Sequence, residues 1–144
     1  MYIGKIPGFM QKTQTVLIIE DEGDIRHFIA RVLELEGYQV LSAGDGATGL
    51  ALLHENAVSL VLLDLRLPGM DGWTVLREIR SDEALSAIPV IVLTAIAEAI
   101  QRKKTLRMGA LKYLVKLLSA GILSQTIAEV LRQKGEKLEP AVVE

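Results

Sequence analysis

Short runs of apolar residues alternate along this chain with longer segments in which apolar side chains recur every three or four positions. The short runs are rich in Val, Ile and Leu, which favours buried β-strands, and the longer segments favour amphipathic helices. We predict strands at 15–19, 38–43, 60–64, 90–94 and 112–115. The predicted helices cover 24–35, 47–53, 73–80, 97–108 and 119–132. This regular alternation implies an α/β fold with a parallel sheet and helices on both of its faces.

Several element ends carry their own signals. Gly37 and Gly109 follow two of the predicted helices, where a residue in the left-handed conformation commonly ends a helix, and Asp71 stands at an N-cap position. The 144 residues suffice for one domain. We place it at 15–132, between an N-terminal extension (1–14) and a C-terminal tail or linker (133–144).

Composition narrows the function classes. The net charge is −2, so no basic field favours direct binding of nucleic acid or of an anionic membrane. No apolar run approaches the ~20 residues that a membrane-spanning helix needs. The chain has no cysteine, which excludes disulfides and zinc-thiolate sites and suits a cytoplasmic protein.

Polar side chains stand where the predicted strands end, and the carboxyl ends of parallel strands share one sheet edge. These side chains are Glu20, Asp21, Asp64, Thr94 and Lys116. Three carboxylates brought together repel one another unless a cation joins them, and oxygen ligands without His or Cys suit Mg²⁺. A hydroxyl and an ammonium are what a transferred phosphoryl group requires. Asp64 is then a candidate nucleophile that becomes an aspartyl phosphate.

Four segments carry a resemblance to a known family. VLIIEDE (16–22), DLRLPGMDG (64–72), VIVLTA (90–95) and YLVK (113–116) resemble the receiver domain of two-component response regulators. The resemblance implies a flavodoxin-like sheet with the strand order 2-1-3-4-5 and five helices. It also implies that Asp64 accepts a phosphoryl group from a histidine kinase or phosphotransfer protein. The implied Mg²⁺ ligands are Glu20, Asp21, Asp64 and the backbone carbonyl of Arg66.

The same resemblance implies a signalling switch. Thr94 and Lys116 would each contact a phosphoryl oxygen, and Tyr113 would change between exposed and buried rotamers on a face that binds a downstream protein. Such a domain is not an enzyme in the ordinary sense, having at most weak self-phosphorylation and autodephosphorylation.

The chain departs from the family pattern in two places. Leu117 follows Lys116 where the family usually has a cis proline, and a cis bond before another residue costs ~2.5–4 kcal/mol. This departure supports an alternative function, a receiver-like adaptor that works without phosphorylation. Leu111 and Lys112 stand where the family often has acidic residues. Four basic residues of the fourth predicted helix therefore lack acidic partners, which disfavours a symmetric dimer through this face. Lys112 could instead meet an acidic partner. The four basic residues are Arg102, Lys103, Lys104 and Arg107.

Other motifs have competing interpretations. The segment Gly44–Gly49 has the spacing G-x-G-x-x-G, with an acid twenty residues after Gly44, and so matches a dinucleotide-binding fingerprint. A complete strand and helix precede it, however, which favours a glycine-rich turn before a short helix. Hydrolases that form an aspartyl phosphate usually have a second acid where Arg66 stands. His27 and His54 show no paired base or ligand spacing, and we assign them no role.

Overall fold

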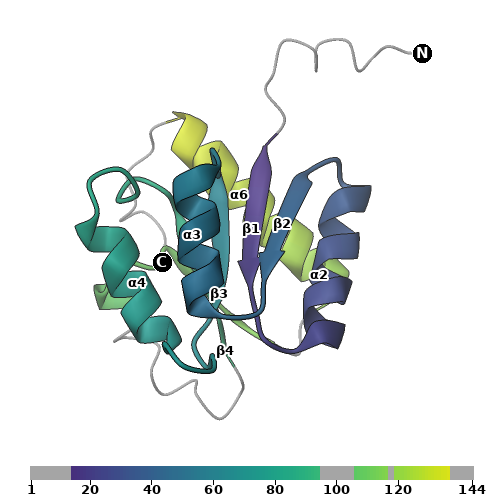
Figure 1. Ribbon diagram of the computed structural model, residues 1–144. Coiled ribbons are helices and arrows are strands. Elements are labelled where there is room, and N and C mark those ends of the chain that lie inside the picture. The colour runs from purple at the N-terminus through teal and green to yellow at the C-terminus, as the bar shows by residue number, and fades with distance from the viewer. Residues whose placement is uncertain (1–13, 95–105, 117–118, 137–144) are drawn as a thin grey trace.

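The computed structural model describes residues 14–94, 106–116 and 119–136. In this part of the chain five parallel strands form one sheet in the order β2-β1-β3-β4-β5 (Figure 1). The strands are β1 (Thr15–Ile19), β2 (Gln39–Ala43), β3 (Leu60–Asp64), β4 (Val90–Thr94) and β5 (Lys112–Val115). The predicted flavodoxin-like strand order is therefore confirmed.

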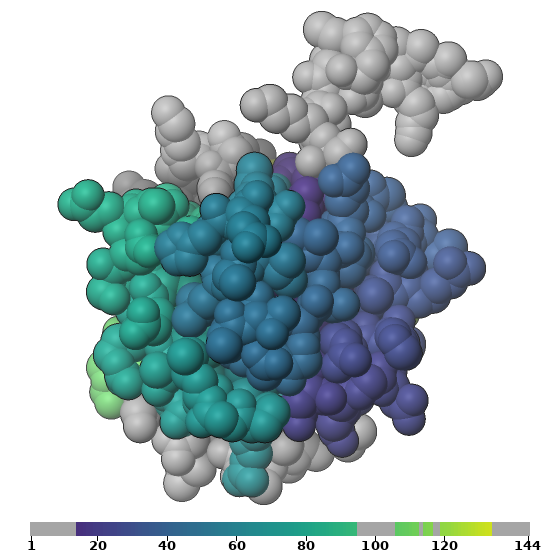
Figure 2. All heavy atoms as spheres, in the orientation of Figure 1, coloured from purple at the N-terminus to yellow at the C-terminus, as the bar shows by residue number. Residues whose placement is uncertain are grey.

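Helices cover both faces of the sheet (Figure 1). The described helices are α2 (Gly23–Leu35), α3 (Gly46–Glu55), α4 (Gly72–Ser81) and α6 (Ala120–Glu136). The first and last of them pack on one face, and α3 and α4 on the other, where their side chains cover most of the sheet (Figure 2). The helix predicted at 97–108 lies mostly outside the described residues. No described helix combines the length and apolarity needed to cross a membrane.

The central strands are buried on both faces. In β1, Val16 and Ile18 belong to the apolar cluster with α2 and α6, whereas Leu17 and Ile19 belong to the cluster with α3 and α4. All four side chains are fully buried. Side chains of a strand alternate between its faces, so burial on both faces explains why the strand reads as an uninterrupted apolar run.

Seven of the eight ends of the described helices differ from their predicted positions, by one to four residues, and two of these differences have local reasons. Helix α3 begins at Gly46 because the side chain of Asp45 accepts a hydrogen bond from the backbone N–H of Thr48 at 2.8 Å, an N-cap that the prediction omitted. Helix α6 continues to Glu136, so residues 133–136, which we predicted to belong to a tail, are helical. Gln133, Lys134 and Glu136 are good helix formers, which offsets the low helix propensity of Gly135 in this last turn.

The glycines of the segment Gly44–Gly49 allow close packing. A Cβ atom on Gly46 would lie 2.6 Å from Cγ2 of Val75 in α4, and one on Gly49 would lie 2.5 Å from Cδ1 of Ile19 in β1. Real Cβ atoms do not approach other atoms so closely, so these two glycines bring α3 against its neighbours. The packing accounts for both glycines without a bound nucleotide and supports the structural interpretation of the motif.

A substitution at Gly49 tests this packing. We expect Gly49→Ala to lower the free energy of unfolding by about 1–3 kcal/mol, because the methyl group overpacks the interface with Ile19. Gly121→Ala in α6 is the matched control, since its Cβ would meet only Ser119 Oγ, at 3.9 Å. Urea denaturation of both variants provides the measurement. Equal stability of the two variants would show that the close approach of α3 does not require Gly49.

Candidate functional site

The carboxyl edge of the sheet brings together the polar residues that the sequence analysis singled out. Asp64 and Thr94 are the last residues of β3 and β4, and each residue is 1% exposed, while Glu20 directly follows β1 and is 0% exposed. Asp21 is exposed beside it. One carboxylate oxygen from each of Glu20, Asp21 and Asp64 can be chosen so that all lie within 4.8 Å of one another. The acidic cluster predicted from strand ends is therefore present.

The ammonium group of Lys116, one residue beyond β5, lies among these carboxylates. Its Nζ atom is 3.1 Å from Asp64 Oδ2 and 3.1 Å from Glu20 Oε1. It also lies 3.6 Å from Glu22 Oε1, a contact that the sequence analysis did not predict. Glu22 directly follows the acidic pair, but nothing in the sequence indicates that its side chain reaches Lys116.

Backbone N–H groups orient two of the carboxylates. The N–H of Arg66 donates to Asp64 Oδ1 at 3.0 Å, and the N–H of Glu22 donates to Glu20 Oε2 at 3.0 Å. Because Lys116 donates to the other oxygen of Asp64, at 3.1 Å, both oxygens of that carboxylate are held in place. A carboxylate held in this way presents its remaining lone pairs in fixed directions, as a nucleophile requires.

Burial shifts the protonation of the cluster. It raises the pKa of Glu20 to about 7, although the N–H of Glu22 and the ammonium of Lys116 favour the ionised form. Burial also raises the pKa of Asp64, although the N–H of Arg66 and the ammonium of Lys116 favour the ionised form of this carboxyl group. Burial disfavours the charged form of Lys116, yet the carboxylates of Asp64 and Glu20 raise the pKa of this lysine overall. Further positive charge at the edge would therefore stabilise the ionised carboxylates.

The donor set fits a hard divalent cation. Glu20 Oε1 is buried, and the ammonium of Lys116 lies 3.1 Å from it but has hydrogen-bond geometry only toward Oε2, so Oε1 accepts no hydrogen bond from the described residues. A buried oxygen with unused acceptor capacity is suited to a metal ion. Together with the carboxylates of Asp21 and Asp64 it forms a site of oxygen ligands only, which is the chemistry of Mg²⁺.

The remaining residues of the predicted switch are described only in part. Tyr113 lies in β5 with its Cα opposite that of Val92, but its side chain is outside the described structure, as are the Lys116-Leu117 bond and residues 102–104. The Nζ atom of Lys112 lies 3.9 Å from Oε1 of Glu129 in α6. Its acidic partner therefore comes from the same chain.

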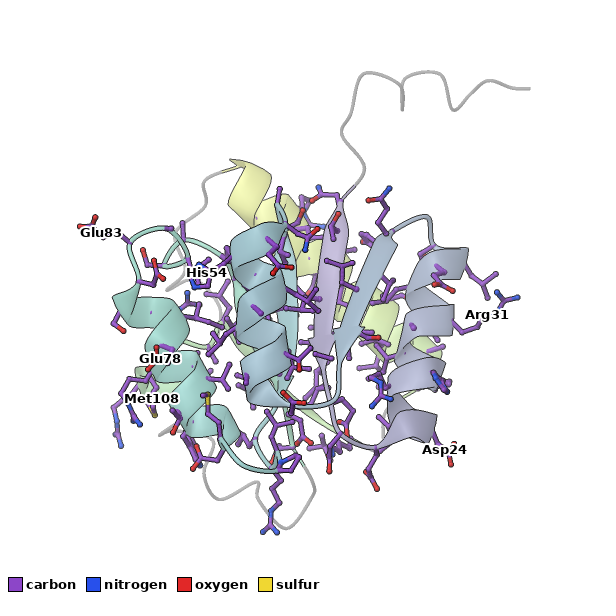
Figure 3. All side chains as sticks on the ribbon, in the orientation of Figure 1. Asp24, Arg31, His54, Glu78, Glu83 and Met108 are labelled. Atoms are coloured by element: carbon purple, nitrogen blue, oxygen red, sulfur yellow. The ribbon has the colours of Figure 1, made fainter. Side chains whose placement is uncertain are left out.

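His54, labelled on α3 in Figure 3, makes a contact that the sequence analysis did not predict. Its Nε2 atom lies 3.5 Å from Oδ2 of Asp82, the residue after α4. The two residues are 28 positions apart, so no local spacing could reveal the contact. It connects two neighbouring helices and lies apart from the acidic cluster.

A doubly wound sheet of this order, with an acidic cluster and a lysine at its carboxyl edge, defines a receiver-type domain. Residues 16–128 match the response regulator receiver domain, and the chain belongs to this family. A receiver domain protein (CheY-like) from Methanospirillum hungatei JF-1 has a similar structure, with a TM-score of 0.81 and 27% identity over 88% of this chain and 99% of that one. A receiver domain protein from Clostridium thermocellum has a TM-score of 0.79 and 30% identity, over 87% and 99% of the two chains.

The curated proteins that this chain resembles are longer than the chain itself. The protein named Probable transcriptional regulator ycf27 from Guillardia theta is 38% identical over 86% of this chain and 48% of its own length. The Phosphate regulon transcriptional regulatory protein PhoB from Pseudomonas aeruginosa is 36% identical over 91% of this chain and 57% of its own. The chain thus spans about half the length of the curated relatives it matches.

The raised pKa of Glu20 predicts how stability depends on pH in the presence of EDTA. The folded protein binds this proton more tightly than the unfolded chain, whose pKa is near 4.5, so stability falls as pH rises from 4.5 through about 7. We expect Glu20→Gln to remove part of this decline and to be more stable than the wild type at pH 8 by about 1–3 kcal/mol. Urea denaturation at several pH values measures the free energy of unfolding of both proteins.

The control for this prediction is Glu78→Gln. Glu78 is exposed on α4, away from the sheet edge (Figure 3). We expect this variant to keep the wild-type pH profile. A Glu20→Gln profile parallel to that of the wild type would contradict the electrostatic analysis of the site.

Proposed function

We propose that this domain is a phosphorylation-controlled signalling switch in which Asp64 accepts a phosphoryl group from a histidine kinase or phosphotransfer protein. The observation that carries the proposal is the buried, doubly oriented carboxylate of Asp64 beside Glu20, Asp21 and Lys116. Membership of the receiver family supports it. The proposed location is the cytoplasm.

The proposed reaction is one phosphoryl transfer. A carboxylate oxygen of Asp64 forms a bond to phosphorus while the bond between phosphorus and the donor's imidazole nitrogen breaks, and the electron pair of that bond leaves with the imidazole. When bound, Mg²⁺ supplies charge neutralisation at the phosphoryl oxygens, and its proposed ligands are Glu20, Asp21, Asp64 and the carbonyl of Arg66. Hydrolysis of the acyl phosphate resets the domain.

The residues opposite the acidic pair stabilise the product. In the proposed switch, Lys116 exchanges its contact with Asp64 Oδ2 for a phosphoryl oxygen, and the hydroxyl of Thr94 contacts another. The N–H of Lys116 donates to the carbonyl of Thr94 at 2.7 Å, so the ends of β4 and β5 are joined at this point. A movement of either residue therefore reaches β5 and the face carrying Tyr113, where we propose that a downstream protein binds.

Intact-mass measurement with acetyl phosphate tests the phosphoacceptor. We expect the wild-type protein to gain the mass of one phosphoryl group in the presence of Mg²⁺, and to gain none with EDTA or as Asp64→Asn. Asp24→Asn is the matched control and should be phosphorylated normally, because Asp24 lies near the site, at the start of α2, but outside the acidic cluster (Figure 3).

Two results would contradict the proposal. A mass gain that persists in Asp64→Asn would place the phosphoryl group elsewhere. No gain in folded wild-type protein, with either acetyl phosphate or a phosphorylated kinase, would favour the receiver-like adaptor that works without phosphorylation.

Lys116 is expected to assist transfer. We predict that Lys116→Met slows phosphorylation by acetyl phosphate about 10²-fold, the usual effect of removing one group that stabilises a developing negative charge. Lys112→Met is the control, since it removes the same charge from the start of β5, where the ammonium lies near Glu129 and not in the site. Initial rates from intact mass at saturating Mg²⁺ compare the two. Equal rates would exclude the proposed role of Lys116.

A further inference from the structure

The loop between β1 and α2 carries two of the three clustered carboxylates but lacks an ordinary helix cap. Asp45 and Asp71 cap α3 and α4 by accepting backbone N–H bonds at 2.8 Å each. Glu22 occupies the N-cap position of α2, and its side chain makes no capping hydrogen bond. The acidic loop is therefore held by other contacts than those that begin the neighbouring helices.

A guanidinium group binds the main chain of this loop. Arg26, in the first turns of α2, donates from Nη1 to the carbonyl oxygen of Glu20 at 2.7 Å and to that of Asp21 at 3.3 Å. The first of these distances is typical of a strong, charge-assisted hydrogen bond. The backbone N–H of Arg26 also donates to the carbonyl of Glu22 at 2.9 Å. One residue thus contacts all three carbonyls of the loop.

These contacts fix the main chain of the acidic pair. The N–H of Glu20 is itself held by the carbonyl of Ala43, at 3.0 Å, and Glu20 is thereby bound on both sides of its Cα atom. Glu20 and Asp21 direct their carboxylates toward Asp64 from this main chain. Because a carboxylate can move only as far as its backbone permits, the carbonyl contacts of Arg26 limit the spread of the three ligand groups.

We propose that Arg26 is a positioning residue that sets the affinity of the acidic pair for a divalent cation. This inference rests on the metal site of the proposed function and adds a residue that does not touch the metal. Both side-chain acceptors of Arg26 in the loop are carbonyl oxygens, so the guanidinium restrains the loop without occupying the carboxylates.

If Arg26 acts by positioning the ligands, its loss should weaken metal binding, whereas if it acts only through its charge, its loss should strengthen metal binding. A positive charge beside the cluster repels a cation, so removing it would tighten metal binding if charge alone mattered. Removing a contact that orients the ligands weakens binding, typically by tenfold or more. The direction of the change therefore separates the two explanations.

The experiment uses Mn²⁺ as the probe and measures free Mn²⁺ by electron paramagnetic resonance, with Mg²⁺ as competitor. We expect Arg26→Met to bind Mn²⁺ about tenfold more weakly than the wild type. Arg26→Lys keeps the charge but lacks the planar fork of donors, and we expect it also to bind more weakly. The control is Arg31→Met on the exposed side of the same helix, which should bind within twofold of the wild type (Figure 3).

The outcomes are distinct. Unchanged or tighter Mn²⁺ binding by a folded Arg26→Met overturns the inference while leaving the proposed metal site intact. If that variant does not fold, as judged by circular dichroism in EDTA, Arg26→Lys decides in the same way. Failure of the wild type to bind Mn²⁺ would overturn the metal site of the proposed function, and this inference with it.

Discussion

The site depends on burying two carboxylates and one ammonium at the carboxyl edge of the sheet. Asp64 and Glu20 are almost fully buried, and removing a charge from water costs several kcal/mol unless a partner compensates it. Their shared partner, Lys116, is 52 residues from Asp64 and 96 from Glu20 in the chain. The two carboxylates therefore gain this partner only when β1, β3 and β5 have assembled in register. The sheet topology and the electrostatics of the site depend on each other.

Two arginines bind backbone carbonyls at opposite edges of the sheet. Arg26 binds carbonyls of the acidic loop, and Arg80 in α4 donates to the carbonyls of Ser86, Ile88 and Gly109 at 2.9–3.1 Å. Burial lowers the pKa of Arg80, but a guanidinium stays charged under ordinary conditions. Arg26 holds the acidic loop at the carboxyl edge, and Arg80 holds the segments that lead into β4 and β5 at the amino edge. The carboxylates of Glu20 and Asp64 are contacted by Lys116 and by the backbone N–H groups of Glu22 and Arg66.

The sequence was most informative where burial is complete. Four strands begin and end where predicted, and three of them, β1, β3 and β4, are central strands whose apolar runs are buried on both faces and therefore have sharp limits. The edge strand β2 begins one residue later than predicted, since the N–H of Tyr38 donates to Leu33 at the end of α2 and so belongs to the helix terminus. The clustering of the three carboxylates at one edge was also predicted, because they stand at the carboxyl ends of parallel strands. The contacts of Glu22 with Lys116 and of His54 with Asp82 were not, because nothing local specifies a partner so distant in sequence.

Burial of the acidic cluster bears on the proposed switch. It raises the pKa values of both Glu20 and Asp64, so the ionised carboxylates are less stable here than in water, although Lys116 offsets part of the cost. Under the proposed function, a phosphoryl group adds negative charge and acceptor oxygens at the one carboxylate that Lys116 already contacts, and it redistributes the contacts of that ammonium. Since the N–H of Lys116 is bonded to Thr94, the redistribution involves two strand ends at once. Under the proposed function, the phosphoryl group can shift the fold between two states only to the extent that its contacts with Lys116 and Thr94 differ between those states.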